Sequence, residues 1–227
     1  MTTPFYLYGS PISTYYNKVK IALIELDLEF EEVPVAPGEG KWPDTGSPSG
    51  KIPYLRHGDS YIYESQAIIE YLEDAQPAGG ASLFPPEAIK RAQCRELIQY
   101  IEQNLDAPMR PVYQSVFWGK PMADGLLERT FEELEKGFRI LLRRADLNPW
   151  LCGDRFSHAD SAAWVHLTTI RWALAIAGHK TFFPEHAPQL ETYLQQLGER
   201  PSIQQVEADR RAASDRIKAE RAAARSR

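Results

Sequence analysis

The stretch YLYGSPISTYYNKVKIALIEL, from Tyr6 to Leu26, decides the fold. A strand-like run at Phe5–Tyr8 breaks at Gly9-Ser10-Pro11, and a helical pattern begins near Tyr15. Apolar residues recur in this pattern at the i, i+3, i+4, i+7 spacing of one helix face, namely Val19, Ala22, Leu23 and Leu26. The stretch therefore predicts a strand that leads through a hydroxyl-rich turn into an amphipathic helix.

Strand and helix signals continue to residue 74. A second strand is predicted at Phe30–Val35, so strand, helix and strand form a βαβ unit with a right-handed crossover. Two further strands, Tyr54–Arg56 and Tyr61–Tyr63, meet at a Gly58-Asp59 turn and indicate an antiparallel hairpin. A helix at Ser65–Asp74 follows. The predicted order is βαβ-ββα, an α/β domain.

The rest of the chain is predicted to be all-helical. The stretch QPAGGASLFPPE, Gln76 to Glu87, interrupts every periodicity and indicates a linker. Helical patterns follow at Ala88–Asp106, Met109–Trp118, Leu126–Ala145, Ser161–Ile176, Ala187–Leu197 and from Ile203 onward. We therefore expect an α/β domain at residues 1–78, a linker at 79–87 and an all-α domain at 88–227.

Composition and charge argue against several classes of protein. The 227 residues are 43% hydrophobic and 25% charged, with a net charge of −5 and no basic cluster of the kind that binds nucleic acid. No run approaches the roughly 18 apolar residues of a membrane span, and no signal-peptide pattern is present, so we expect a cytoplasmic protein without a membrane partner. The histidines and the two cysteines, Cys94 and Cys152, show no metal-binding spacing, so neither a metal site nor a disulfide framework is expected.

Four motifs in this order closely resemble the soluble glutathione transferases, over nearly the whole chain. They are YGSPISTYYNKVKIALIE (Tyr8–Glu25), GKIPYL (Gly50–Leu55), YESQAIIEYLE (Tyr63–Glu73) and FSHADSAAW (Phe156–Trp164). The resemblance implies a thioredoxin-like N-terminal domain that binds glutathione as co-substrate, and a helical domain that offers an electrophile site. It also implies a homodimer. The spacing of the first motif is similar to the phi, tau and theta classes, which use a serine.

The resemblance places glutathione-binding residues in two of these motifs. Ile52 precedes Pro53, whose peptide bond is cis in the family, and the Ile52 backbone would pair with glutathione as a short added strand. Ser65, a preferred helix N-cap, would hold the γ-glutamyl carboxylate with its hydroxyl and N–H, and Glu64 would hold the ammonium group. Lys51, with Lys41 and Trp42, would contact the glycyl end, although the loop around Lys41 departs from the commoner family pattern.

Ser13 is the predicted catalytic residue. A free thiol has a pKa of about 8.5, so a hydroxyl donor and a helix N-terminus would be needed to make the thiolate abundant at neutral pH. Thr14, Ser10 and Tyr8 are alternative donors in the same turn. Residues 1–93 contain no cysteine, so redox chemistry through a protein thiol at this turn is excluded.

An electrophile pocket is expected from the helix after Pro108, where aromatic and apolar residues recur, with a further aromatic from the first helix. The candidates are Tyr16, Met109, Arg110, Tyr113 and Phe117, with Arg110 as a polar contact to an anionic product. Ser157 and Asp160 in FSHAD have the spacing of a helix capping box, which we favour over a catalytic interpretation.

The favoured function is a glutathione transferase that conjugates the glutathione thiolate to hydrophobic electrophiles. Two alternatives are a glutathione-dependent peroxidase, dehalogenase or isomerase on the same scaffold, and a non-catalytic binding or regulatory member of the family. The residues present do not distinguish conjugation from reduction.

Overall fold

The computed structural model describes residues 4–35, 47–76 and 79–225. The chain divides into two compact units, one formed by Met1–Leu83 together with Glu199–Arg227, the other by Phe84–Gly198. This grouping differs from the expected division, because it assigns the last helix to the N-terminal unit rather than to the helical domain. Each unit is described separately below.

The N-terminal unit is built on a four-stranded sheet with the order β2-β1-β3-β4. Its strands are β1 (Phe5–Gly9), β2 (Phe30–Pro34), β3 (Tyr54–His57) and β4 (Ser60–Tyr63). β1 runs parallel to β2 and antiparallel to β3, and β3 and β4 form the expected hairpin. With α1 (Thr14–Glu25) and α2 (Ser65–Asp74), the predicted βαβ-ββα order is confirmed.

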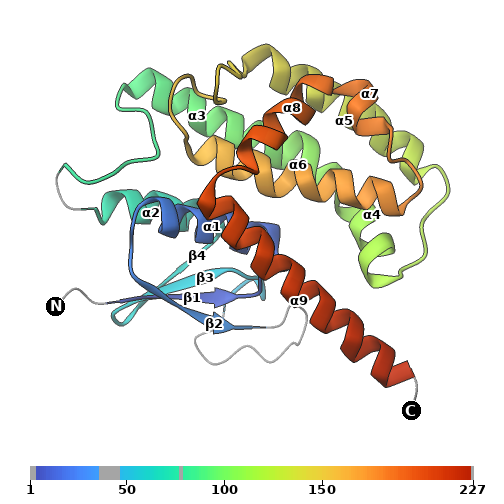
Figure 1. The fold of residues 1–227 in the computed structure, drawn as a ribbon, viewed down its shortest axis with the longest axis horizontal. Helices are drawn as coiled ribbons and strands as arrows, with labels where there is room; N and C mark the ends of the chain where they lie inside the picture. The colour runs from blue at the N-terminus through green and yellow to red at the C-terminus, as the bar shows by residue number, and fades with distance from the viewer. Residues whose placement is uncertain (1–3, 36–46, 77–78, 226–227) are drawn as a thin grey trace. The chain divides into compact units, whose positions relative to one another are not determined.

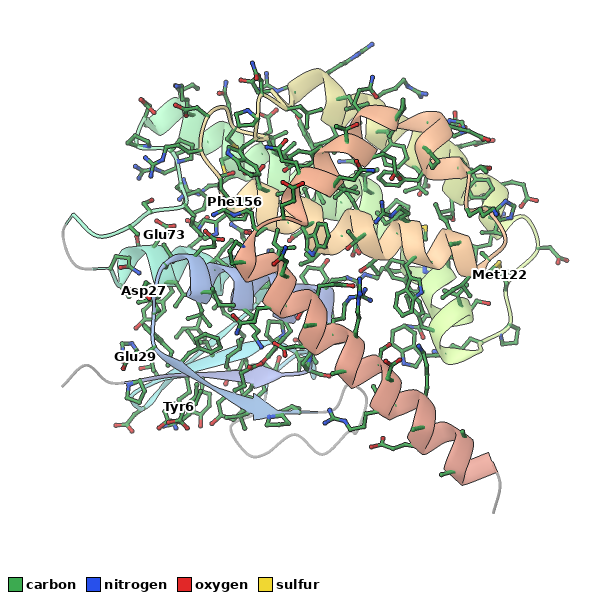
Figure 2. The ribbon with its side chains drawn as sticks, in the orientation of Figure 1. Tyr6, Asp27, Glu29, Glu73, Met122 and Phe156 are labelled. Atoms are coloured by element: carbon green, nitrogen blue, oxygen red, sulfur yellow. The ribbon has the colours of Figure 1, made fainter. Side chains whose placement is uncertain are left out.

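α1 and α2 lie on the same face of this sheet (Figure 1). Burial alternates along β1, where Phe5, Leu7 and Gly9 are buried and the tyrosines between them are half-buried. Figure 2 shows the side chain of Tyr6 on the face opposite to the two helices. This period of two is typical of a strand that packs one face on a core.

α1 packs closely against the end of β1 because Gly9 has no side chain. A Cβ added at Gly9, where φ is +153°, would lie 2.5 Å from Cδ2 of Tyr16. The predicted apolar face of α1 is confirmed, because Val19, Ala22 and Leu23 are fully buried. Two lysines of the same helix, Lys18 and Lys20, are also buried, which the periodicity of apolar residues did not indicate.

The last helix, α9 (Pro201–Arg225), packs on α1 within the N-terminal unit. Arg200 forms a bidentate ion pair with Glu25 at the end of α1, with its Nε 3.1 Å from Oε1. Further along, the Lys20 ammonium contacts Asp209 at 2.7 Å and Glu32 of β2 at 2.6 Å. One buried cation therefore joins α1, β2 and α9.

The second unit is all-helical, as predicted. It comprises α3 (Ala88–Ile101), the π-helix η1 (Glu102–Asp106), α4 (Ala107–Trp118), α5 (Leu126–Arg144), α6 (His158–Ile176), α7 (Phe182–His186) and α8 (Pro188–Leu197). The patterns predict Met109–Trp118 as a Pro-punctuated continuation of the helix at 88–106, and η1 does connect α3 to α4. The π-helical turn itself was not predicted. The short α7 was not predicted.

Gly137 of α5 makes room for the π-helix. A Cβ added at Gly137 would lie 2.4 Å from the carbonyl oxygen of Asn104 and 2.6 Å from Cδ2 of Leu105. The two backbones therefore meet at a distance that only glycine allows, and η1 packs directly on α5.

The capping box at the start of α6 is confirmed. The Asp160 carboxylate accepts hydrogen bonds from the Ser157 backbone N–H and hydroxyl, both at 2.7 Å. It also accepts from the Leu151 backbone N–H at 2.9 Å and from the Tyr193 hydroxyl. This buried carboxylate fixes the turn before α6 to the helix itself, so the motif is structural.

None of the helices in the described ranges is both long and apolar enough to cross a membrane.

Candidate functional site

The strand register brings three of the four family motifs to one end of the sheet, namely the one with the predicted catalytic Ser13 and the two with predicted glutathione-binding residues. Tyr8, near the end of β1, is paired with Tyr54 at the start of β3, and Tyr54 is paired with Tyr63 at the end of β4. The segments that follow β1, precede β3 and follow β4 therefore emerge at the same edge. These segments carry Ser13, Lys51 to Pro53, and Glu64 with Ser65.

Ser13 is the N-cap of α1. Its backbone is extended, with φ −85° and ψ 124°, and its side-chain oxygen accepts a hydrogen bond from the Tyr16 N–H at 3.3 Å. Its own N–H donates to the Ser10 carbonyl at 2.9 Å, which closes the turn after β1. The hydroxyl oxygen accepts in this cap, so its proton can be donated to a further group.

The alternative donors occupy different positions around the turn. Thr14 is the first residue of α1, and Ser10 supplies the carbonyl that closes the turn. Tyr8 lies on the sheet, where its ring stacks on Tyr54 with centroids 4.5 Å apart. Its hydroxyl accepts a hydrogen bond from Nε of Arg56 at 3.3 Å.

The Ile52-Pro53 peptide bond is cis, as expected from the family pattern. Pro53 is buried, Ile52 is half-buried and Lys51 is exposed directly before β3. The two other residues proposed for the glycyl end, Lys41 and Trp42, lie outside the described residues.

Glu64 and Ser65 lie at the junction of β4 and α2. Ser65 is the first residue of α2 and is 5% exposed, so it is not the N-cap that was expected. Glu64 is the N-cap; it is exposed and makes no side-chain capping hydrogen bond. Glu64 has φ 66° and ψ 120°, a conformation that a residue with a side chain rarely adopts. Strain of this kind is often retained at binding sites, because the surrounding structure holds the residue in place for its ligand.

The residues expected to line an electrophile pocket fall into different environments. Met109 and Tyr113 of α4 are buried core residues at 0% and 4% exposure. The ring of Tyr16 is 1% exposed and its hydroxyl donates to Glu32, so its packing within the N-terminal unit argues against a pocket role. Arg110 is half exposed, and its Nη2 lies 2.6 Å from the buried carboxylate of Asp106.

Phe117 belongs to an aromatic cluster that is partly open to solvent. Its ring centroid is 5.6 Å from that of Tyr113, 5.8 Å from Trp118 and 4.7 Å from Trp172. Trp118 is 50% exposed and Trp172 is 37% exposed. Sequence reasoning did not select Trp172, although a tryptophan near the end of a helix opposite the selected helix is a signal that could have found it.

A buried ionic cluster lies beneath α4. The Asp106 carboxylate is 3.0 Å from Nδ1 of His166 in α6, and the Tyr113 hydroxyl donates to it at 3.3 Å. Burial alone would raise the pKa of Asp106, but the charge and hydrogen bond of His166 and the charge of Arg110 outweigh burial and lower it to about 2. Asp106 is therefore ionised at neutral pH, and its carboxylate contacts both Arg110 and Tyr113.

Among the described side chains, no group of three or more His, Cys, Asp or Glu is arranged to hold a metal ion.

Known proteins with similar sequences are glutathione S-transferases. Residues 7–80 match the family model described as the glutathione S-transferase N-terminal domain. A glutathione S-transferase of Pseudomonas putida is 32% identical over 209 residues, which cover 91% of this chain and 92% of the relative. Glutathione S-transferase 3 of Zea mays is 31% identical over 168 residues, covering 70% of this chain and 74% of the relative.

Solved structures show the same fold. Glutathione transferase F7 from Populus trichocarpa aligns with a TM-score of 0.75 and 26% identity, covering 91% of this chain and 99% of that structure. Poplar glutathione transferase F1 aligns with a TM-score of 0.80 and 24% identity, covering 93% and 100%. Together with the sequence relatives, these similarities extend over both the sheet-containing and the helical parts. The chain belongs to the glutathione S-transferase family of enzymes.

Proposed function

We propose that this enzyme conjugates the thiolate of glutathione to hydrophobic electrophiles. The observation that carries the proposal is the position of Ser13, the N-cap of α1, at the sheet edge from which Pro53 and Ser65 also emerge. In the reaction, the thiolate sulfur forms a bond to an electrophilic carbon, and the leaving group departs with its electron pair.

The chemistry requires glutathione to be bound as a thiolate. The Ser13 hydroxyl oxygen accepts from the Tyr16 N–H, so the hydroxyl proton is available to the sulfur. This hydrogen bond and the N-terminus of α1 both favour the anion. Lowering the thiol pKa by about two units corresponds to about 2.7 kcal/mol and would make the thiolate the majority species near neutral pH.

The remaining groups at the sheet edge match the other parts of glutathione. The Ile52 backbone precedes β3 and supports pairing with the cysteinyl unit as a short added strand. The Ser65 hydroxyl and the N-terminus of α2 suit the γ-glutamyl carboxylate, and Glu64 suits the ammonium group. Lys51, which lies within the described residues, is proposed to bind the glycyl carboxylate. Lys41 and Trp42 are proposed as further contacts to the glycyl end.

The second substrate is assigned to the helical unit. Phe117, Trp118 and Trp172 provide apolar surface that is partly exposed, which suits a hydrophobic electrophile. Arg110 provides a half-exposed cation, held by Asp106, for an anionic product. We further propose that the enzyme is a cytoplasmic homodimer that uses no metal, as inferred from the family resemblance and the sequence composition.

The test is the ultraviolet absorbance of thiolate when glutathione is titrated with pH in complex with wild-type protein and with Ser13→Ala. The wild-type complex is expected to ionise about two pH units below free glutathione. In Ser13→Ala much of that shift is expected to disappear. Thr14→Val, Ser10→Ala and Tyr8→Phe are the matched controls, and each is expected to retain the wild-type titration.

The titration can contradict the proposal in three ways, and each result has a different meaning. Absence of glutathione binding to wild-type protein would remove every glutathione-dependent function, and binding without a shifted pKa would remove the thiolate mechanism. A loss of the shift in Thr14→Val instead of Ser13→Ala would move the donor by one residue. Product analysis with a panel of electrophiles and peroxides then distinguishes conjugation from reduction.

A further inference from the structure

Asn17 is a buried polar residue of α1 that lies outside the predicted set of site residues. It comes four positions after the N-cap Ser13, and it is 2% exposed. The residue at this position of a helix is often apolar and packs on the residue before the cap, which is Ile12 in this chain. Here the position holds a primary amide instead, so its hydrogen bonds indicate its role.

The Asn17 amide contacts the turn between β1 and α1. Its Nδ2 donates to the Pro11 carbonyl oxygen at 2.8 Å, and the Asn17 backbone N–H donates to the Ser13 carbonyl oxygen at 3.0 Å. Side chains of a helix point towards its N-terminus, so an amide one turn into α1 reaches back over the turn that precedes the helix. One residue therefore holds this turn at two points, on either side of Ile12.

The hydrogen bond to Pro11 fixes a feature of the turn that the other contacts leave open. The Ser13 N–H donates to the Ser10 carbonyl at 2.9 Å, which closes the turn, and the proline ring fixes φ of Pro11. Neither sets the direction of the Pro11 carbonyl, because the peptide after this position can point either way in a closed turn. The Asn17 amide sets that direction, and with it the path of the backbone into Ser13.

The helix cap by itself holds the Ser13 hydroxyl only weakly. The Tyr16 N–H is 3.3 Å from the Ser13 hydroxyl oxygen, which is longer than the usual N–H···O distance of about 2.7–3.2 Å. The bond from Asn17 to Pro11, at 2.8 Å, lies within that range. The backbone before Ser13 is therefore held more tightly than its side chain, so the turn decides where the hydroxyl lies.

The other end of the Asn17 amide argues against a role in stability alone. Its Oδ1 is buried, and none of the described residues donates a hydrogen bond to it. A buried acceptor without a donor lowers stability, so an apolar residue that packs on Ile12 would suit the core better. What the Nδ2 group holds therefore explains the amide better than core packing does.

We propose that Asn17 is a positioning residue for the Ser13 hydroxyl. It has this role only if the proposed function holds, in which that hydroxyl donates to the glutathione sulfur. Such a hydrogen bond weakens steeply as its angle closes, so it depends on the exact direction of the donor. Ser13 comes one residue after the Pro11–Ile12 peptide, and rotation of this peptide would move the hydroxyl. Asn17 thus acts through Ser13 and makes no contact with the sulfur itself.

The effect of replacing Asn17 can be separated from a change of charge. Asn17 is neutral, and the two cations near it on α1 have partners of their own. Lys18 donates to Oε1 of Gln66 at 3.3 Å, and Lys20 contacts Glu32 at 2.6 Å. A neutral substitution at Asn17 therefore leaves every charge of the helix in place, and a shift in the thiol pKa then reports on geometry.

The test repeats the ultraviolet titration of bound glutathione with Asn17→Leu and with the double variant Ser13→Ala, Asn17→Leu. Asn17→Leu is expected to fold and to lose about one unit of the thiol pKa shift, a tenfold change in the ionisation constant. The double variant is expected to titrate as Ser13→Ala alone does, because Asn17 acts through that hydroxyl. Ser202→Ala is the control, since it removes a buried hydroxyl that donates to Glu25 at the other end of α1.

Two further measurements distinguish positioning from a general loss of structure. The affinity of Asn17→Leu for S-methylglutathione, which has no ionisable thiol, is expected to equal that of wild type. The pH profile of kcat is expected to move about one unit to higher pH, so that activity falls at neutral pH and recovers in alkali. Structural damage would instead lower activity at every pH and weaken binding of S-methylglutathione.

Four results would overturn the proposal. The first is a wild-type titration in folded Asn17→Leu, and the second is a double variant that loses more of the shift than Ser13→Ala does. The third is an unchanged pH profile with lower activity throughout. The fourth is failure of both Asn17→Leu and the smaller Asn17→Ala to fold, which would assign Asn17 to stability. Failure of the proposed function is distinguishable, because it appears in wild type and Ser13→Ala without any substitution at Asn17.

Discussion

Oδ1 of Asp106 and Nδ1 of His166 lie 3.0 Å apart, and neither side chain has any exposed surface. Asp106 ends the π-helix η1, whereas His166 lies in the middle of α6. A buried carboxylate is stable only when paired, and this one is paired with His166 and with the half-exposed Arg110. The contact therefore links the folding of the helical unit to the position of Arg110.

The Asp106–His166 pair predicts a pH-dependent stability. Burial alone would lower the pKa of His166, but the charge and hydrogen bond of Asp106, with a contribution from Glu102, outweigh it and raise the pKa. The stabilisation by His166 is thus complete below the ordinary pKa of about 6.5 and is lost as the pH rises through the folded-state value. The pKa of Asp106 is lowered to about 2, so its contribution is present above about 3.9 and is lost as the pH falls towards 2.

We expect His166→Gln to lower the free energy of unfolding by about 3 kcal/mol near pH 5, since it leaves a buried anion with one partner fewer. The difference from wild type should shrink at pH values above the folded-state pKa of His166. Urea unfolding across pH 5–9 measures both effects. His186→Gln is the control, because the contact of His186 with Glu135 at 3.6 Å is open to solvent and an exposed pair contributes little. A stability difference between wild type and His166→Gln that stays constant with pH would contradict the raised pKa of His166.

Removing Lys20 and removing its two acidic partners are expected to lower the free energy of unfolding by different amounts. Its side chain is 1% exposed, whereas Glu32 and Asp209 are 40% and 41% exposed. Lys20→Met leaves two carboxylates that water can solvate, so we expect a loss of about 1 kcal/mol. The double substitution Glu32→Gln with Asp209→Asn leaves a buried ammonium group, and we expect a loss of about 3 kcal/mol. Urea unfolding measures the stability of both variants. A larger loss of unfolding free energy in Lys20→Met than in the double variant would contradict this expectation.

Gly137→Ala is expected to destabilise the helical unit by about 1–3 kcal/mol, although alanine favours a helix. The new Cβ would lie 2.4 Å from the Asn104 carbonyl oxygen, which belongs to a backbone that cannot move aside easily. Lys136→Ala, at the exposed neighbouring position of α5, is the control and should be close to neutral. Equal stability of the two variants in thermal unfolding would show that η1 relaxes to accept the methyl group.

Ser13 and Ser65 predict different kinetic defects if the proposed function holds. Ser65→Ala removes a group assigned to ground-state binding of glutathione, so we expect a higher KM for glutathione with little change in kcat. Ser13→Ala removes stabilisation of the thiolate, so we expect kcat at neutral pH to fall by about 10-fold or more. Steady-state kinetics with a chromogenic electrophile measures both. Equal effects on KM and kcat in the two variants would indicate that the serines act together in binding.

Local features of the fold could be predicted from the sequence because they depend on neighbours in the chain. The bounds of α2 match the predicted Ser65–Asp74, and the Ser157–Asp160 capping box is present as expected. α1 begins at Thr14, one residue before the predicted start, which makes Ser13 its cap. α7 was missed because five residues are too few to show the 3.6-residue period of a helix. The π-helix was missed because it depends on the close approach of Gly137, which lies in another helix.

The candidate site was predictable to the extent that it consists of motifs at the ends of strands. The positions of Ser13, Pro53 and Ser65 could be selected from sequence, but their common edge follows from the register of β1, β3 and β4. The pocket residues were less predictable. An aromatic residue at a helical spacing can face the core, as Tyr113 does, or solvent, as Trp118 does.

The sequence by itself determined the βαβ-ββα order of the N-terminal unit, the helical character of the second unit, the capping box at Ser157 and the family. These depend on periodicity and on hydrogen bonds between residues a few positions apart. Only the tertiary structure decided the contacts of Asp106 with His166 and of Lys20 with Asp209. Each joins separate elements, so it exists only after packing has brought distant parts of the chain together, which no local pattern of residues specifies.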